Sequence, residues 1–244
     1  MLGLQQLDAR SFWRDEVASV FFAQHPVGEL ATIIGRERDK VGLANMATYY
    51  LGLHFWLWLG ETEARIRLLS VLAGAATVIP VYFLAKRLAG WTGGGAAAVI
   101  YAAHPFAIRY SQEARGYSMA MLAVAALTLI LLVAIERRSP WWWAAYGVIA
   151  GLALYVHLFL LWTIGVHGLW VLATRNVPPW RSALAALVPL GLAAAPLPLI
   201  ILQYGGGHGW IEGVNLGHVV GLLVFLGGGT LVLLVTSALA GVPT

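Results

Sequence analysis

Two acidic groups in this 244-residue chain lie beside arginine residues, and these side chains are the first candidates for chemistry. Asp15 and Glu16 follow an arginine in the string Ser-Phe-Trp-Arg-Asp-Glu, and Glu113 lies between Arg109 and Arg115. Carboxylates can exchange protons, and guanidinium groups can bind anions. An ionisable cluster at a membrane boundary is often part of a functional site. The structural alternative is that these side chains form an ion-paired helix end.

Several other kinds of chemistry find no support in the sequence. The chain has no cysteine, which excludes a thiolate nucleophile, a disulfide and a cysteine-ligated metal. His208, Trp210 and Glu212 lie in a glycine-rich segment, but their spacing matches no recognised metal motif. The basic residues are dispersed and form no single stripe, so we expect no nucleic-acid partner despite the net charge of +4.

Apolar helices must position the candidate residues, because 60% of the chain is hydrophobic and only 11% is charged. A soluble globular domain has about 25% charged residues, so a water-soluble core of this size is excluded. Apolar runs long enough to cross a bilayer occur at 66–85, 92–108, 117–135, 141–174, 182–203 and 216–240. The run 141–174 is too long for one crossing and has His157 near its middle, so it is expected to form two. We predict an all-α, polytopic membrane helical bundle of about seven spans.

The basic residues predict how this bundle is oriented. Short loops that contain lysine and arginine stay in the cytoplasm. Every second loop has a basic pair: Lys86/Arg87, Arg137/Arg138 and Arg175/Arg181. These loops contain one acid, Glu136, and in this topology all the other acidic residues lie on the opposite side. Asp15, Glu16 and Glu113 are therefore expected at the extracytoplasmic face.

Residues 1–64 hold most of the acidic residues and are too polar to span a membrane. We interpret them as a long first extracytoplasmic loop with amphipathic helices that lie in the membrane interface. The aromatic residues expected at headgroup level are Trp13, Tyr49, Tyr50, Trp56 and Trp58. Residues 65–244 are expected to form the transmembrane helical domain.

Residues 11–16 resemble the acidic motif in the first extracytoplasmic loop of GT-C glycosyltransferases, in the branch related to protein O-mannosyltransferases and the lipid A aminoarabinose transferase. Tyr49-Tyr50, running into His54-Phe55-Trp56, is similar to the interfacial helix that closes that loop. Residues 65–87 resemble the next span, and the segment from His104-Pro105 to Tyr117 resembles the second loop with its acidic residue. The agreement extends over residues 8–135, and beyond them only the helical architecture is similar.

The resemblance implies an inverting transfer of a sugar from a polyprenyl-phosphate donor to an acceptor hydroxyl, outside a prokaryotic plasma membrane. It implies Asp15 as the base, Glu16 as a residue that orients the site, and Glu113 facing Asp15 across a cavity. Glu113 would bind the acceptor or the sugar, and a divalent metal between Asp15 and Glu113 stays open as a cofactor. The implied partners are the donor, a lipid, glycan or protein acceptor, and the bilayer. The residues implied in substrate binding are Arg109, Arg115, Lys40, Tyr50, Tyr117 and His104. Among them, the cationic side chains would bind the donor phosphate.

Two departures from the resembling family affect these expectations. Many relatives have His-Pro-Pro or Lys-Pro before the double tyrosine, whereas this chain reads Ala-Asn-Met-Ala-Thr at 44–48, with Lys40 or Asn45 as substitutes. Relatives also have a span before the acidic loop and more spans after the seventh, so we expect this chain to be a fragment. For His104, a hydrogen-bonded packing role is the alternative to substrate contact.

Two other function classes stay open. A transporter or lipid flippase would also need charges on the outer side and broken helices. No acid deep within an apolar run and no paired half-helices support it. A non-catalytic membrane scaffold of the same fold is the second alternative.

Overall fold

The computed structural model describes residues 7, 11–29, 45–199 and 217. Throughout this part of the chain the regular elements are helical: eight α-helices and one 3-10 helix. In order they are α1 (Arg14–Gln24), α4 (Ala47–Trp56), η2 (Leu57–Leu59), α5 (Glu63–Ala103), α6 (Pro105–Ser111), α7 (Tyr117–Arg137), α8 (Pro140–Leu154), α9 (Leu160–Ala173) and α10 (Trp180–Ala194). The predicted all-α fold is confirmed.

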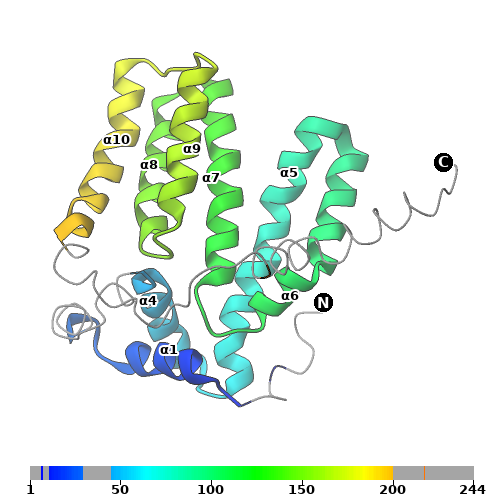
Figure 1. Cartoon of the computed structure of the whole chain (residues 1–244), viewed down its shortest axis with the longest axis vertical. Helices are drawn as coiled ribbons and strands as arrows, with labels where there is room; N and C mark the ends of the chain where they lie inside the picture. Colours follow the sequence, from blue (N-terminus) through cyan, green and yellow to red (C-terminus); the bar gives the residue numbers. More distant parts are fainter. Residues whose placement is uncertain (1–6, 8–10, 30–44, 200–216, 218–244) are drawn as a thin grey trace, which may run out of the picture.

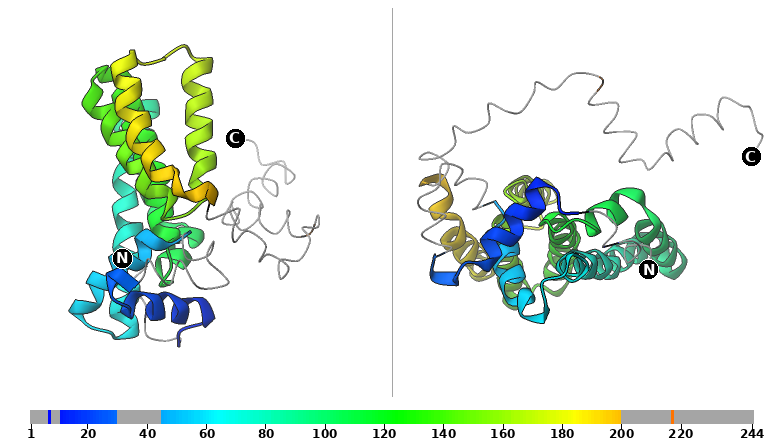
Figure 2. Two further views of the ribbon diagram at one scale, coloured as in Figure 1. Left: turned by 90° about the vertical axis from the view of Figure 1, so that its left-hand side faces the viewer. Right: turned by 90° about the horizontal axis from the view of Figure 1, so that it is seen from below.

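The long helices run side by side, and the short helices α1 and α4 lie at one end of the bundle (Figure 1). We call this the α1/α4 end. The view from below in Figure 2 shows α1 lying across it. The bend of α5 and the links from α7 to α8 and from α9 to α10 lie at the opposite end (Figure 1).

Three helices in the described residues are long and apolar enough to cross a membrane: Glu63–Ala103, Tyr117–Arg137 and Trp180–Leu199. α9 is apolar but shorter. α10 ends at Ala194, and after a turn at residue 195 the chain is helical again as far as Leu199, so the apolar segment extends over Trp180–Leu199. The last expected span, 216–240, lies outside the described residues apart from residue 217, and the count of seven stays a prediction.

α5 contains one separately predicted span, 66–85, and most of a second, 92–108, joined by a sharp bend. Ala89 and Gly90 have non-helical backbone angles, and the φ of 68° at Gly90 lies in the left-handed region that glycine adopts at little cost. The chain turns back on itself there (Figure 1). The second arm ends at Ala103 and not at the predicted Ile108, because the following His104 precedes a proline and takes extended angles.

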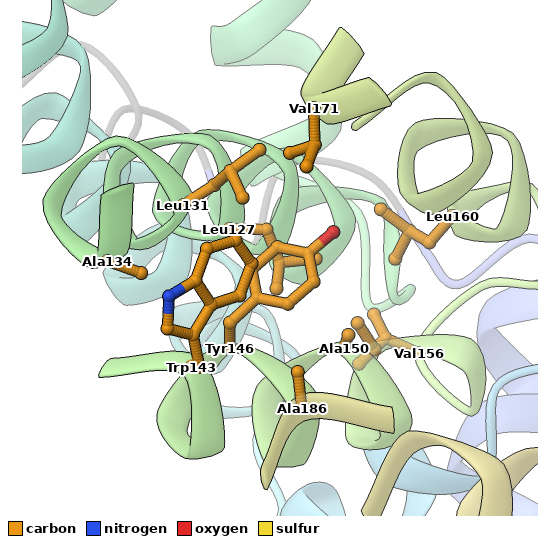
Figure 3. Close-up of a cluster of buried hydrophobic side chains, with 11 residues drawn as sticks. Leu127, Leu131, Ala134, Trp143, Tyr146, Ala150, Val156, Leu160, Val171 and Ala186 are labelled. Atoms are coloured by element: carbon orange, nitrogen blue, oxygen red, sulfur yellow. The ribbon is translucent and has the colours of Figure 1, made fainter. Parts of the chain in front are cut away.

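A core of buried apolar side chains joins α7, α8, α9 and α10 (Figure 3). Leu127 and Leu131 of α7 pack there with Trp143 and Tyr146 of α8. The predicted division of 141–174 into two helices is confirmed, since α8 ends at Leu154 and α9 begins at Leu160, with His157 in the turn between them.

Glycines of α8 let α10 approach closely. A Cβ added at Gly147 would lie 2.1 Å from the carbonyl oxygen of Ala186, and one at Gly151 would lie 2.7 Å from the Cβ of Ala193. Small residues four apart on one helix face are a common packing device between membrane helices. This contact fixes α10 against the bundle.

A second core fixes the segment before α5 on the bundle. Tyr49 and Tyr50 are 0% and 3% exposed, so their rings contact protein and not lipid headgroups. α1, α4 and the start of α5 enclose both rings, and the Tyr49 hydroxyl lies 3.1 Å from Ser70 Oγ. Trp13 and Trp58, by contrast, are exposed.

Candidate active site

The first acidic pair lies in the first turn of α1, where the two carboxylates have different environments. Glu16 is buried, and its carboxylate accepts a 3.3 Å hydrogen bond from the Trp13 N–H at the helix start. This contact is one half of a capping box, and an acid here also suits the positive end of the helix dipole. The side chain of Asp15 is 41% exposed, so it can meet a substrate.

The carboxylate of Glu16 is occupied by protein groups. Arg67, at the start of α5, donates from Nε and Nη2 to its two oxygens, each at 2.8 Å. The backbone N–H of Ala114 donates to Oε1, also at 2.8 Å. Both side chains of the ion pair are almost fully buried, and Arg67 also contacts Glu63 and the carbonyl of Leu7. Glu16 therefore joins α1, α5 and the segment 112–116.

Segment 112–116 links α6 to α7 and contains the second acid of the candidate site. Glu16 holds the N–H of Ala114, and Ser70 donates a 3.2 Å hydrogen bond to the carbonyl of Arg115. Ser70 is itself in contact with the buried Tyr49 hydroxyl. These two hydrogen bonds, one to the N–H of Ala114 and one to the carbonyl of Arg115, fix the backbone of the segment.

Arg115 is brought against Asp15, although the two residues are 100 positions apart in the sequence. Its Nη2 lies 3.6 Å from Asp15 Oδ2, and its Nη1 donates to the Asp15 carbonyl at 3.3 Å. The Arg115 side chain is 14% exposed, and its Nε is buried with no hydrogen-bond partner among the described residues. Burial raises the pKa of the neighbouring Tyr50, and the charge of Arg115 offsets part of this rise.

Glu113 lies on the same segment and pairs with Arg109 of α6 at 3.6 Å. Burial raises the pKa of Glu113, with the Arg109 charge opposing this effect and the Glu16 charge adding to it. The two acidic groups that the sequence singles out therefore come from segments that meet in space. An uncharged Glu113 is favoured more than it would be in water.

An apolar cavity of about 690 Å³ begins beside these charges. Tyr117 and His157 line it, and the Arg115 guanidinium carbon is 5.8 Å from the centroid of the Tyr117 ring. The other residues around it are mostly apolar: Thr77, Val81, Tyr101, Phe106, Tyr110, Ala120, Met121, Val124, Ala125, Phe159, Leu160 and Thr163. They belong to α5, α6, α7 and α9 or to the turn before α9, so the cavity lies between helices of the bundle. Burial, followed by the charge of Arg115, lowers the pKa of His157.

The remaining candidates have different settings. His104 begins α6, where its Nδ1 accepts a 3.2 Å hydrogen bond from the Phe106 N–H. The side chain of Asn45 accepts a hydrogen bond from the Leu158 N–H and so fixes the turn that contains His157. Lys40, His208 and Glu212 lie outside the described residues.

The structure adds two residues to the candidate site, Arg67 and Ser70. Sequence reasoning gave no role to Arg67 or Ser70, although Arg67 is the one charge in an apolar run, and such charges usually face the interior of a bundle. Within the described residues, no group of three or more His, Cys, Asp or Glu side chains is placed to hold a metal ion. Asp15 and Glu113 each have an arginine as the nearest opposite charge.

Helices long and apolar enough to cross a membrane, with carboxylates and arginines beside an apolar cavity, define a helical membrane protein. The chain belongs to the dolichyl-phosphate-mannose-protein mannosyltransferase family, whose model matches residues 44–201. This is a GT-C membrane glycosyltransferase family that uses a polyprenyl-phosphate mannose donor. The suspected resemblance is thereby confirmed. No curated protein and no solved structure matches the chain.

Proposed function

We propose that this protein transfers a sugar from a polyprenyl-phosphate donor to an acceptor hydroxyl, with inversion at the anomeric carbon, at the extracytoplasmic face of the membrane. The observation that carries the proposal is the contact between Asp15 and Arg115, with Arg115 beside Tyr117, which lines the apolar cavity. It combines a proton acceptor, a phosphate-binding cation and space for a lipid chain in one place. Neither rival class is favoured by a comparable feature.

Asp15 is the proposed base. Its carbonyl is held by Ser19 Oγ at 3.1 Å and by Arg115, so the residue is fixed in place. Its carboxylate, which contacts Arg115 at 3.6 Å, is 41% exposed and accessible to an acceptor. A carboxylate in this position can accept the proton of the acceptor hydroxyl as the new glycosidic bond forms. The bond from the anomeric carbon to the phosphate oxygen breaks in the same step, and polyprenyl phosphate leaves.

Arg115 is the proposed partner of the donor phosphate. Its buried Nε has no partner among the described residues, and a buried donor of this kind favours an anionic ligand. Guanidinium groups bind phosphate in bidentate contacts. The adjoining cavity suits the isoprenoid chain, because most of its lining residues are apolar and it lies between helices of the bundle.

The other residues have supporting roles in this proposal. Glu113, on the same segment as Arg115, contacts sugar or acceptor hydroxyls, and Arg109 steadies its carboxylate. Tyr50 and Tyr117 flank the Arg115 guanidinium, and Lys40 adds a second cation for the phosphate. Glu16 positions Asp15 and the segment 112–116 and makes no substrate contact, because its oxygens already bind protein groups.

The stereochemistry of the product tests this proposal. Purified protein is supplied with a polyprenyl-phosphate β-linked mannose donor and with acceptors of the lipid, glycan and peptide classes, and the anomeric configuration of the product is read by NMR. A single displacement gives an α-linked product. A β-linked product would contradict the single displacement and require a covalent intermediate. Absence of transfer to every acceptor class, despite donor binding, would favour the scaffold.

A further inference from the structure

The end of the bundle opposite the α1/α4 end is strongly basic. Its cations, which we call the basic end, are Lys86 and Arg87 near the bend of α5, Arg137 and Arg138 at the end of α7, and Arg175 and Arg181 around the link from α9 to α10. Glu136 is the one acid on these described segments, and it pairs with Arg87 at 3.2 Å. The basic end therefore has a large surplus of positive charge.

Most of this charge is not used inside the protein. Arg137, Arg138, Arg175 and Arg181 are all exposed, and none of them forms an ion pair with another described residue. A surplus of exposed, unpaired cations is electrostatically unfavourable unless an anionic surface lies opposite it.

Two of these arginines occupy backbone positions that normally favour glycine. Arg138 ends α7 with a φ of 50°, and Arg175 follows α9 with a φ of 57°. They are the two non-glycine residues with positive φ in the described part of the chain. Glycine is the usual residue at such helix ends because it adopts this conformation without strain. An arginine at both positions places a cation beyond each helix end at a local conformational cost.

Tryptophans surround the same charges. Trp91, Trp141 and Trp180 are 71%, 83% and 67% exposed, and each lies near the bend of α5 or at the first turn of α8 or α10. Lys86 Nζ lies 3.1 Å from the centroid of the Trp91 ring, and the Arg181 guanidinium carbon lies 5.3 Å from that of Trp180. Exposed indoles beside cations are typical of the level at which lipid headgroups meet water.

We propose that the basic end binds the phosphate groups of anionic phospholipids, with Arg138 and Arg175 as its principal contacts. The positive surplus gives charge complementarity with an anionic leaflet, and the indoles set the depth at which the headgroups lie. The bound molecules are bilayer lipids and not the sugar donor, because the proposed donor site lies at the other end of the helices. The surface is thus a lipid-binding site separate from catalysis.

Native mass spectrometry of the purified protein in detergent tests this inference, with phosphatidylglycerol and phosphatidylcholine as the two probes. The parent protein should retain phosphatidylglycerol in preference to phosphatidylcholine, and salt should weaken the retention. Arg138→Gly with Arg175→Gly should keep the fold, because glycine relieves the strained backbone. It should lower the affinity for phosphatidylglycerol roughly fivefold for each charge, on the order of 25-fold together.

Matched variants separate charge from structure. Arg138→Lys with Arg175→Lys should retain most of the binding, and Arg14→Gln, which removes an exposed charge from α1, should leave it unchanged. If the glycine pair misfolds, Arg137→Gln with Arg181→Gln removes two charges at ordinary helical positions and should show a smaller but measurable loss. Equal retention of both lipids by the parent, or unaltered binding in the charge-removing pairs, would overturn the proposal. Displacement of the lipid by glycerol phosphate at similar concentration would also overturn it, in favour of a simple anion site.

Discussion

The guanidinium group of Arg67 forms two 2.8 Å hydrogen bonds with the carboxylate of Glu16, which lies 51 positions earlier in the chain. Because both side chains are almost fully buried, removing one leaves an uncompensated charge. We expect Arg67→Met to destabilise the protein by about 3–5 kcal/mol. A fall in apparent melting temperature, measured in detergent, checks this.

The double variant Glu16→Leu with Arg67→Met is the control for this prediction. It removes both charges, so it should recover much of the lost stability. Sugar transfer should nevertheless stay low, because the N–H of Ala114 loses its acceptor and the segment 112–116 is no longer fixed. A double variant that is less stable than either single variant would contradict a compensating pair.

The close approach of α8 and α10 gives a prediction about stability alone. Gly147→Ala would place a methyl group 2.1 Å from the Ala186 carbonyl oxygen, so the helices must separate. Overpacking of this kind costs about 1–3 kcal/mol. Gly165→Ala in α9, where an added Cβ meets nothing within 4 Å, is the matched control and should be neutral or slightly stabilising. Thermal unfolding of both variants in detergent measures the difference, and equal effects would refute the close packing.

Glu113 gives a prediction about pH. Burial raises its pKa above the usual 4.5, so the neutral carboxyl is favoured on folding. That stabilising contribution is fully present below the unfolded pKa and is lost as pH rises through the folded pKa. The parent should therefore lose thermal stability relative to Glu113→Gln as the pH rises above the usual pKa of 4.5. Parallel stability curves of the two proteins would contradict the raised pKa of Glu113.

Much of the fold could be predicted from the sequence, because the signals are local. Apolar runs gave the helices, and His157 marked the turn between α8 and α9. The bend at Ala89 and Gly90 also follows the end of an apolar run. The second arm of α5 ends before the predicted Ile108 because His104 precedes Pro105, and the residue before a proline is disfavoured in a helix.

The candidate site was less predictable, because its contacts join residues far apart in the chain. Nothing local shows that Glu16 is buried against Arg67 while its neighbour Asp15 is accessible. Aromatic residues suit both a membrane interface and a protein core, so the burial of Tyr49 depends on how α1 and α4 pack. The resemblance implied that Glu113 faces Asp15, whereas the contact between Asp15 and Arg115 was not predicted.

The proposed orientation can be checked by cysteine labelling, since the chain has no cysteine of its own. Glu61→Cys lies at the α1/α4 end and Asn176→Cys at the basic end, and both positions are exposed. An impermeant maleimide should label Glu61→Cys in intact cells, and should label Asn176→Cys only after the membrane is permeabilised. The reverse pattern would invert the topology and place the candidate site in the cytoplasm.

The proposed roles of Asp15 and Arg115 predict different effects of their substitution on donor binding. Arg115→Ala removes the proposed phosphate partner, so it should weaken donor binding. Asp15→Asn keeps the shape of the side chain but removes the proton acceptor, so donor binding should persist.

Single-turnover transfer from pre-bound donor by Asp15→Asn tests the central claim most directly. The account predicts a rate roughly 10²- to 10⁴-fold below that of the parent, with the dissociation constant of the donor unchanged. Transfer at the parental rate would contradict it and would leave Glu113 as the next candidate for the base.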